Sequence, residues 1–477
     1  MWMDRPGLGA LAALGRRLGD LVSVRRRGGR PVEVRLDGPS PAAVAEGLRS
    51  EPGFVWLDGG ASGHRLFRRP VAVLSARDGR AVVSSRGGRV VCRGGFSLLA
   101  AAFAAWGGDP GLVLAGFLGY ELAWELETLP PPPSDDLGLP DLHLALYDEV
   151  LLWDGAGWVL RASEGLRPLT AARVLSARLV LAAAARAGDA DLGRPAANPP
   201  LSRPDRAGFE GIVERAVAHI AAGDIFQVNL CRRLETALPW GGVWPLYRRL
   251  RAASPAARGA FLDLGGRRAL LSVSPEVFLS VRGRRVETRP IKGTRPRGAT
   301  PEEDRDLAAA LLASEKDRAE LTMIVDVARN DLARVCETGS VAVDPFPELT
   351  ALPTLHHTVA TVHGRLRPGV GSVDLLRATF PPASITGAPK IRAIGIAAGL
   401  EPRRRGPAMG ALGWLDLAGD LELSVAIRTA AASRGRVAYH AGCGIVADSE
   451  PRAEWAESAV KAKAFLTALG APPEGEA

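Results

Sequence analysis

The hydrophobic pattern divides the chain into two stretches of different regularity. Up to about residue 185, short apolar runs such as 71–74 and 150–153 alternate with glycine-rich turns, which is typical of short strands mixed with helices. The segment GDADLGRPAANPPLSRPD then favours a loop, and apolar positions at helical spacing resume at 209–219. The pattern predicts a boundary near 190–205, with one domain over 1–190 and a second over 205–470.

The second stretch contains clearer elements. The segments ALLSVSPEVFLSV and RVAYHAGCGIVAD predict strands, and residues 301–335 and 451–469 have the apolar spacing of helices. No fixed repeat period is visible, and no glycine fingerprint lies between a strand and a helix in the manner of a dinucleotide-binding fold. These features predict a mixed α/β fold with large sheets.

Composition and charge narrow the classes of function. The 477 residues are 47% hydrophobic and 23% charged, which is ordinary for a folded globular protein. The net charge of +8 comes from scattered arginines without a basic tail, so it indicates small anionic substrates better than nucleic acid. Four distant cysteines, with neither a secretion signal nor a long apolar segment, predict a cytoplasmic protein without a membrane span.

Two pairs of acidic residues are candidates for holding a metal ion. Asp317 and Glu320 lie three apart on one predicted helix, as do Glu454 and Glu457 on another, so each pair projects from one helix face. Carboxylate oxygens on two rigid helices suit a hard divalent cation such as Mg²⁺. Taken singly, such a pair is more often a solvated helix face.

The segment SVSPEVFLSVRGRRVETRPIKGTRPRG contributes two further candidates. Glu276 follows a predicted strand, and Lys292 lies in a turn framed by Pro and Gly, in a chain whose basic residues are mostly arginine. A lysine can act as a nucleophile when it loses its proton, whereas arginine keeps its proton. A solvated turn residue is the alternative for Lys292.

Glycine-rich turns and a histidine pair complete the candidate chemistry. SITGAPK and GCGIVADSE adjoin strands and expose backbone N–H groups that can bind a carboxylate, although ordinary tight turns have the same composition. His356 and His357 lie on a predicted strand, so their side chains point to opposite faces and only one can enter a site.

Together these segments resemble the chorismate-utilising enzyme family. The matching motifs are AAGDIFQVNL, SVSPEVFLSV, TRPIKGTRPRG, DRAELTMIVDVARNDLARV, FPPASITGAPKIRA, LSVAIRT and GCGIVADSEPRAEWAES, which occur in family order over about 205–465. GFLGYELAWELETLP and FVWLDGG give a weaker match before them. The resemblance implies a sandwich of two large, mostly antiparallel sheets flanked by helices, with the N-terminal and C-terminal parts packed together.

The resemblance also implies roles for single residues. Glu320 and Glu457 are expected to hold Mg²⁺, with Asp317 and Glu454 around its waters, and Glu276 is expected to protonate the departing C4 hydroxyl of chorismate. The remaining candidates are expected to bind the substrate: Asn229, Thr294, His357, Ser384, Thr386, Arg428, Gly442, Gly444 and Lys461.

One residue indicates the subtype. PIKGT resembles the aminodeoxychorismate synthases, in which this lysine is implicated as the nucleophile that adds to C2 of chorismate, whereas anthranilate synthases usually have PIAGT. Asn229 in QVNL also resembles that group. The expected activity is amination of chorismate at C4, with anthranilate synthase component I, which aminates C2 and releases pyruvate, as the alternative. No glutaminase nucleophile is visible, so a separate glutamine amidotransferase subunit is expected to supply ammonia.

Three positions depart from the family pattern. Ala408 replaces a frequent Tyr, so one aromatic wall of the pocket would be replaced, by Met409 or Trp414. Cys443 replaces a more usual Gly or Ala. LDGG replaces the LLES-like stretch of tryptophan-inhibited relatives, which weakens the case for feedback inhibition.

Overall fold

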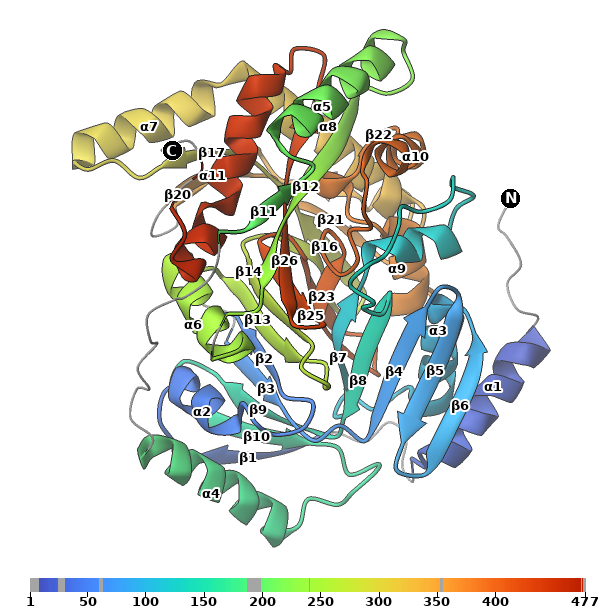
Figure 1. Cartoon of the computed structure of the whole chain (residues 1–477). Coiled ribbons are helices and arrows are strands. Elements are labelled where there is room, and N and C mark those ends of the chain that lie inside the picture. Colours follow the sequence, from blue (N-terminus) through green and yellow to red (C-terminus); the bar gives the residue numbers. More distant parts are fainter. Residues whose placement is uncertain are drawn as a thin grey trace.

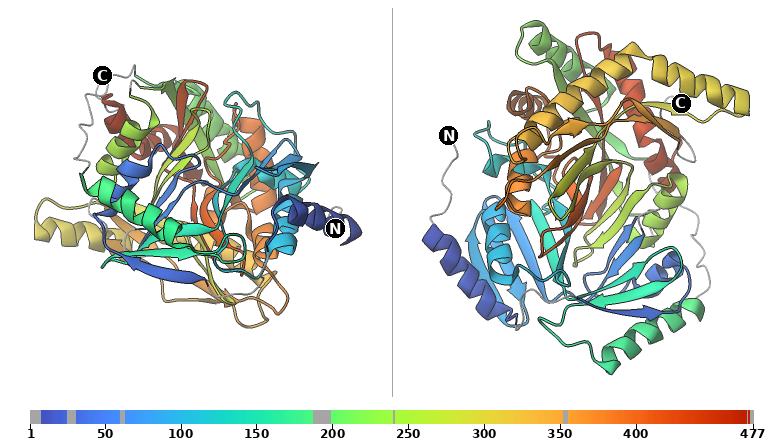
Figure 2. Two further views of the ribbon diagram at one scale, coloured as in Figure 1. Left: turned by 90° about the horizontal axis from the view of Figure 1, so that it is seen from below. Right: turned by 180° about the vertical axis from the view of Figure 1, so that it is seen from behind.

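Two large antiparallel sheets form the centre of the fold, and helices lie against their outer faces (Figures 1 and 2). The computed structural model describes residues 8–24, 31–59, 63–186, 199–239, 241–351, 355–472 and 474. The architecture confirms the predicted sandwich of large antiparallel sheets flanked by helices. None of the helices in the described part of the chain combines the length and apolarity needed to cross a bilayer.

The first sheet has 12 strands, and its order mixes early and late segments of the chain. Strand β22 (Gly387–Ala388) pairs with β12 beside the main path. The path runs through β1 (Val32–Leu36), β10 (Trp158–Ala162), β9 (Glu149–Trp153), β3 (His64–Phe67), β2 (Val55–Asp58), β13 (Arg258–Asp263), β14 (Ala269–Ser274), β25 (Thr429–Ser433), β26 (Arg436–Ile445), β12 (Gln227–Ala237) and β11 (Leu201–Arg203).

The second sheet has 11 strands and is equally mixed in chain order. Its path runs through β18 (Ala342–Val343), β21 (Val362–Arg365), β16 (Arg285–Arg289), β15 (Val277–Arg282), β24 (Leu421–Val425), β23 (Ala411–Asp416), β7 (Val113–Leu118), β8 (Leu142–Tyr147), β4 (Ala72–Arg77), β5 (Arg80–Ser85) and β6 (Gly88–Arg93). A small third sheet consists of β17 (Ile291–Pro296), β20 (Leu355–Val359) and β19 (Glu348–Ala351).

Helices pack on the outside of this sandwich, and α7 extends away from it in Figures 1 and 2. They are α1 (Leu8–Leu21), α2 (Pro41–Leu48), α3 (Gly95–Trp106), α4 (Ala171–Arg186), α5 (Arg206–Ala221), α6 (Val243–Ala253), α7 (Pro301–Ala313), α8 (Glu315–Ala333), α9 (Ser372–Thr379), α10 (Lys390–Leu400) and α11 (Pro451–Leu469), with the short 3-10 helices η2 (Tyr120–Glu125) and η3 (Ala383–Ile385).

Alternation of side chains along the strands separates the core into layers. In β13, Phe261 packs edge-on against Trp244 of α6, with the ring centroids 4.9 Å apart. Its neighbours Ala260 and Leu262 belong to the apolar layer between the two sheets, together with Phe117 of β7. Because successive strand residues point to opposite faces, one strand contributes to both layers.

Both large sheets join residues from either side of the boundary near 190–205. Strand β2 pairs with β13 in the first sheet, and β7 pairs with β23 in the second. The N-terminal and C-terminal parts are therefore packed together, as predicted. The division into domains 1–190 and 205–470 stays a prediction from the sequence.

The helix predicted over 301–335 is two helices. Ser314 ends α7 and begins α8, and its hydroxyl accepts a hydrogen bond from the backbone N–H of Asp317. A serine at this position satisfies one of the free N–H groups in the first helical turn, which favours a new helix start. The break brings the first turn of α8 to the small third sheet, where it contacts β17.

Candidate active site

The predicted site residues gather where β12 and β26 meet the small third sheet. Asn229 of β12 pairs with Gly444 of β26. A Cβ atom on Gly444 would lie only 2.5 Å from Gln227 Nε2 and 2.9 Å from Lys292 Nζ. A glycine here therefore leaves the space that the two polar side chains occupy, and it brings the backbone of β26 next to Lys292.

Lys292 lies on strand β17 and not in a solvated turn. The pairing of β17 with β20 is irregular between Lys292 and Thr294, and Gly293 at this bulge has φ +74°, a conformation that favours glycine. The Lys292 side chain is 14% exposed, and its Nζ lies 3.4 Å from Glu320 Oε2. The Thr358 hydroxyl also donates a hydrogen bond to the Lys292 carbonyl oxygen. The bulge thus directs this lysine inward, toward a predicted metal ligand.

Glu276 is a buried carboxyl close to the same lysine. It lies between β14 and β15 and is 4% exposed. Burial raises the pKa of Glu276 to about 7, although the Ser384 hydroxyl and the positive charge of Lys292 favour the charged form. A carboxyl of this kind holds a proton near neutral pH, as a general acid requires.

We expect the turnover number to fall as pH rises through about 7, because the Glu276 carboxyl then loses its proton. Rates would be measured with the free ammonia concentration held constant, so that ammonia itself does not shape the profile. Glu276→Gln should lower the turnover number by roughly 10²–10⁴-fold and remove this limb from the residual activity. A flat wild-type profile across the same range would exclude Glu276 as the acid.

His357 is the member of the histidine pair that faces the site. Its Nδ1 shares a 2.9 Å hydrogen bond with the Thr294 hydroxyl, and its buried Nε2 has no partner among the described residues. Burial and the nearby Arg428 lower the pKa of His357 to about 4, so the imidazole is neutral. His356 instead bonds Asp304 of α7, at 2.8 Å. The two histidine side chains thus point to opposite faces of β20, as predicted from the sequence.

Arg428 occupies strained backbone in the same region. Its φ of +50° lies in the left-handed region, which non-glycine residues adopt rarely and which persists where surrounding structure holds it. The charge of Arg428 acts on both Glu276 and His357. The structure therefore brings these three predicted residues together.

Gln227 is a site residue that the sequence analysis did not single out. It is 1% exposed, and neither its Nε2 nor its Oε1 has a hydrogen-bond partner in the described part of the chain. Buried polar groups are nearly always satisfied, so an unpaired amide beside Lys292 and Gly444 indicates a position where a ligand bonds. The available signal was strand alternation, which places Gln227 on the same face of β12 as Asn229.

Arg405 holds the backbone around the predicted substrate ligands in place. Its guanidinium donates to the carbonyl oxygens of Asn229, at 2.7 Å, and Ile385, at 2.9 Å, and is paired with Glu401. Asn229 N also donates to the Thr386 carbonyl, at 2.7 Å. These bonds hold β12 against the η3 turn, so the strand and the turn present a rigid wall.

Not every predicted substrate ligand has a free polar group. The Thr386 hydroxyl donates to the Ala383 carbonyl, at 3.0 Å, inside its own turn. The Asn229 amide donates to Cys231 Sγ at 3.3 Å. Ser384 lies in the same turn with its hydroxyl near Glu276. The binding roles of Thr386, Asn229 and Ser384 stay predictions, and Ser384 is the one nearest the acid.

The acidic pair on α8 faces two different cations. Glu320 contacts Lys292, whereas Asp317 Oδ2 accepts a hydrogen bond from Arg295, at 3.1 Å. Glu320 is therefore the α8 carboxylate that lies beside Lys292, whereas Asp317 lies beside Arg295, farther along β17.

The acidic pair on α11 lies beside Lys461. Lys461 Nζ donates to Glu457 Oε1, at 2.7 Å, and to the carbonyl oxygen of Gly442, at 2.8 Å. Burial opposes ionisation of Glu457, but Lys461 and Lys292 outweigh burial and lower the pKa of this carboxyl. Glu454 is 3% exposed and accepts a hydrogen bond from Ser449 at 2.7 Å.

These carboxylates fit a hard divalent cation. Glu320 and Glu457 both interact with Lys292, although they come from different helices. Their negative charges are now balanced by lysine ammonium groups, which a divalent cation can replace. The second oxygen of Glu454 is buried without a partner among the described residues, as expected for a group that bonds a metal-bound water. The assignment of Mg²⁺ to this set remains a proposal.

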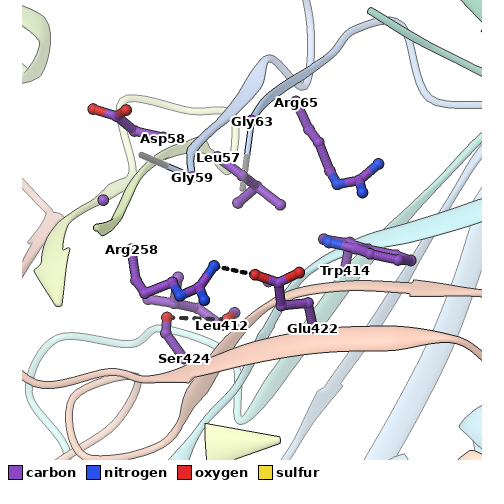
Figure 3. A pocket seen from close by; sticks show the side chains of 12 residues that line it. Leu57, Asp58, Gly59, Gly63, Arg65, Arg258, Leu412, Trp414, Glu422 and Ser424 are labelled. Carbon is purple, nitrogen blue, oxygen red and sulfur yellow. Dashed lines mark hydrogen bonds and ion pairs between the residues drawn. The ribbon is translucent and has the colours of Figure 1, made fainter. Parts of the chain in front are cut away.

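A cavity lies between the two sheets, and none of the predicted site residues lines it (Figure 3). The LDGG segment lines it through Leu57, Asp58 and Gly59. Arg258 pairs with Glu422 inside it, and the Arg65 guanidinium lies 4.2 Å from the ring centroid of Trp414. Arg258 and Glu422 therefore balance each other inside the cavity, Asp58 is paired with Arg251 outside its lining, and Trp414 lines this cavity.

Comparison with known proteins identifies a matching family. The family described as chorismate binding enzyme matches residues 52–467. Anthranilate synthase component 1 of Streptomyces coelicolor is 40% identical over 381 residues, which are 75% of this chain and 72% of that protein. Aminodeoxychorismate synthase component 1 of Bacillus subtilis is 37% identical over 361 residues, which are 74% of this chain and 76% of that protein.

One solved structure is similar to this chain in both fold and sequence. Anthranilate synthase component I from Streptococcus pneumoniae TIGR4 superposes with a TM-score of 0.74 and 31% identity, covering 85% of this chain and 92% of that chain. The relatives thus include two kinds of synthase, anthranilate synthase and aminodeoxychorismate synthase.

Proposed function

Because this chain belongs to the family of chorismate-binding enzymes, we propose that it aminates chorismate at C4 to give 4-amino-4-deoxychorismate. That product is the precursor of 4-aminobenzoate on the route to folate. The amino group comes from glutamine through ammonia. Aminodeoxychorismate synthase component 1 proteins among the relatives support the proposal.

The observation that carries the proposal is the position of Lys292. Its Nζ is held inside the site, next to Gly444 and Glu320, and not in solvent. An amine at this position is a nucleophile, which a smaller or always-charged side chain cannot replace. The buried Glu276 lies within electrostatic reach of it as a proton donor.

The proposed reaction uses these two residues in sequence. After a proton leaves its ammonium group for solvent, the amine of Lys292 bonds to C2 of chorismate while both ring double bonds shift, and the C4–O bond breaks as Glu276 gives its proton to the departing hydroxyl, which leaves as water. Ammonia then attacks C4, both double bonds shift back, and the C2–N bond to Lys292 breaks. Glu276 and the lysine return to their starting protonation states by proton exchange with solvent and the incoming ammonia.

The remaining residues would bind the substrate carboxylates. Arg428 supplies a fixed positive charge, and the neutral His357, held by Thr294, offers its free Nε2. Lys461 adds an ammonium group next to the Gly442 carbonyl. Gly442 and Gly444 lack side chains, so a substrate can approach the backbone of β26 closely.

Magnesium would be held by Glu320 and Glu457, with Asp317 and Glu454 around its waters. Asp317 would have to exchange its contact with Arg295 to take part. When bound, the ion would neutralise negative charge on a substrate carboxylate. It would also take the place of the ammonium groups that now balance these two glutamates.

Anthranilate synthase component I is the second candidate, because relatives with that name are as similar as the first group. Pyruvate release separates the two activities, since C2 amination expels the pyruvate side chain and C4 amination keeps it. We expect chorismate and ammonia to be consumed in the presence of Mg²⁺ without release of pyruvate. Stoichiometric pyruvate would replace the proposal by the second candidate.

We expect glutamine-dependent turnover to require a separate amidotransferase subunit. The component 1 names of the relatives imply a partner subunit, and no glutaminase nucleophile was found in this sequence. With a high concentration of ammonium salt near neutral pH, which supplies free ammonia while Glu276 keeps part of its proton, the purified chain should use ammonia but not glutamine. Adding a glutaminase subunit should restore glutamine use. Turnover of glutamine by the single purified chain would contradict this expectation.

A further inference from the structure

One side chain near the acidic helix α11 has no part in the proposed reaction. Cys443 lies on β26 and is fully buried. Its Sγ and one carboxylate oxygen each of Glu454 and Glu457 all lie within 4.8 Å of one another. Among the described residues, no other set of three histidine, cysteine, aspartate or glutamate side chains brings its ligand atoms this close together.

Within this group, Glu454 has one carboxylate oxygen without a hydrogen-bond partner among the described residues. The Ser449 hydroxyl donates to its Oε1 at 2.7 Å, which fixes the carboxylate. Its Oε2 is buried and has no hydrogen-bond partner among the described residues. Leaving a buried carboxylate oxygen unpaired costs free energy that a bound cation would recover.

Cys443 gives the group a donor that magnesium does not prefer. Its Sγ lies 3.3 Å from the carbonyl oxygen of Glu454, so the thiol is oriented toward the start of α11. Thiolate sulfur selects borderline and soft cations, whereas carboxylates alone suit hard ones. One sulfur with two carboxylates, plus a water, is a donor set that zinc accepts in open four-coordinate sites.

We propose that Cys443, Glu454 and Glu457 form a binding site for a thiophilic divalent cation of the zinc class. The metal–sulfur bond forms as the thiol proton passes to solvent, and a water completes the coordination. Zinc–sulfur and zinc–oxygen bond lengths place tetrahedral ligand atoms about 3.4–3.6 Å apart. The ligand atoms therefore have to close in by at most roughly 1.4 Å, and the half-exposed Glu457 can move by a rotamer change.

Lysine ammonium groups from three elements face this site and compete with the metal. Lys292 of β17 acts on Glu457. Lys461 donates to Glu457 from the same helix, and Lys316 of α8 acts on both glutamates from across the gap. A divalent cation has to displace the Lys461 ammonium from Glu457. Lys461 is itself 40% exposed, so it has room to turn toward solvent.

The site has a consequence that rests on the proposed function. Glu457 is also a proposed magnesium ligand, so a zinc-class ion bound to Cys443 would remove Glu457 from the magnesium site. The cation would therefore inhibit turnover, and inhibition would weaken as magnesium is raised. The binding site itself does not depend on which reaction the enzyme catalyses.

Cobalt(II) is the probe that reads the metal–sulfur bond directly, without turnover. The purified full chain, titrated with Co²⁺, should develop a sulfur-to-metal charge-transfer band in the near ultraviolet that saturates at one equivalent, and Zn²⁺ should abolish it. Cys443→Ala should lose the band. Cys336→Ala, which removes another buried thiol outside the group, should keep it. Glu457→Gln should weaken Co²⁺ binding by at least roughly tenfold.

The outcomes separate this proposal from the proposed function. A band that persists in Cys443→Ala, or no band in the wild type, overturns the thiophilic site whatever the reaction is. A band with the expected dependence on Cys443 supports it, even if the product assay rejects C4 amination. Circular dichroism of each variant checks folding, and Glu457→Gln supplies the decisive comparison if Cys443→Ala does not fold.

Discussion

Replacing Lys292 by arginine is expected to reduce C4 amination on the order of 1,000-fold or more, and alanine is expected to be no better. The guanidinium keeps the positive charge opposite Glu320 but cannot lose a proton to attack carbon. An effect of this size is about 4 kcal/mol of transition-state stabilisation. Steady-state rates with saturating ammonia measure the loss.

The matched control is Lys463→Arg, which changes an exposed lysine on α11 that faces away from the site. It should leave the rate unchanged. In the wild type, incubation with chorismate and Mg²⁺ but no ammonia should leave an adduct on the peptide that contains Lys292, detected by mass spectrometry. Full activity of Lys292→Arg together with no adduct would remove the nucleophile role.

Glu320→Gln and Glu457→Gln should each lower turnover on the order of 1,000-fold while the fold is kept, because each change removes a charged oxygen ligand from the magnesium site. Glu320 lies on α8 and Glu457 on α11, so a similar loss of turnover in both variants would not result from distortion of a single helix. Rates measured across a magnesium titration are expected to need far more Mg²⁺ in either variant.

Glu315→Gln is the control for this pair, since Glu315 is an exposed carboxylate in the first turn of α8. Its rate and magnesium dependence should match the wild type. If Glu320→Gln or Glu457→Gln keeps near-normal activity at low magnesium, the metal assignment is wrong. Circular dichroism verifies that each variant folds.

Local features of the fold were predictable from the sequence. The spacing of apolar residues gave helix α11 over 451–469, and alternation gave the strands around Glu276 and Gly444. The order of strands was not predictable, because pairing depends on contacts between distant segments. β12 pairs with β26, about two hundred residues later, and β2 pairs with β13 across the glycine- and proline-rich segment.

The candidate site was predictable in its residue types but not in its contacts. A lysine among arginines was a useful signal, since the chain has only five lysines, and Lys292 and Lys461 both form ion pairs or hydrogen bonds within the site. Helical spacing could not show that Asp317 faces Arg295 while Glu320 faces Lys292. That depends on how β17 packs on α8, which is tertiary structure.

Buried polar groups without partners are visible only in three dimensions. Gln227 lies in the motif AAGDIFQVNL, but nothing in the sequence shows that its amide lies unpaired beside Lys292. Cys443 was noted as a departure from the family pattern, yet its closeness to Glu454 and Glu457 required the packing of α11 on β26. Both findings come from which side chains the sheet and helices bring together.

Identification of the product tests the central claim most directly. The purified chain would be incubated with chorismate, ammonia and Mg²⁺, and the product separated by chromatography and identified by mass spectrometry and NMR. The account predicts 4-amino-4-deoxychorismate, which becomes 4-aminobenzoate when a lyase is added. Anthranilate formed without any lyase would contradict C4 amination and assign the chain to the second candidate function.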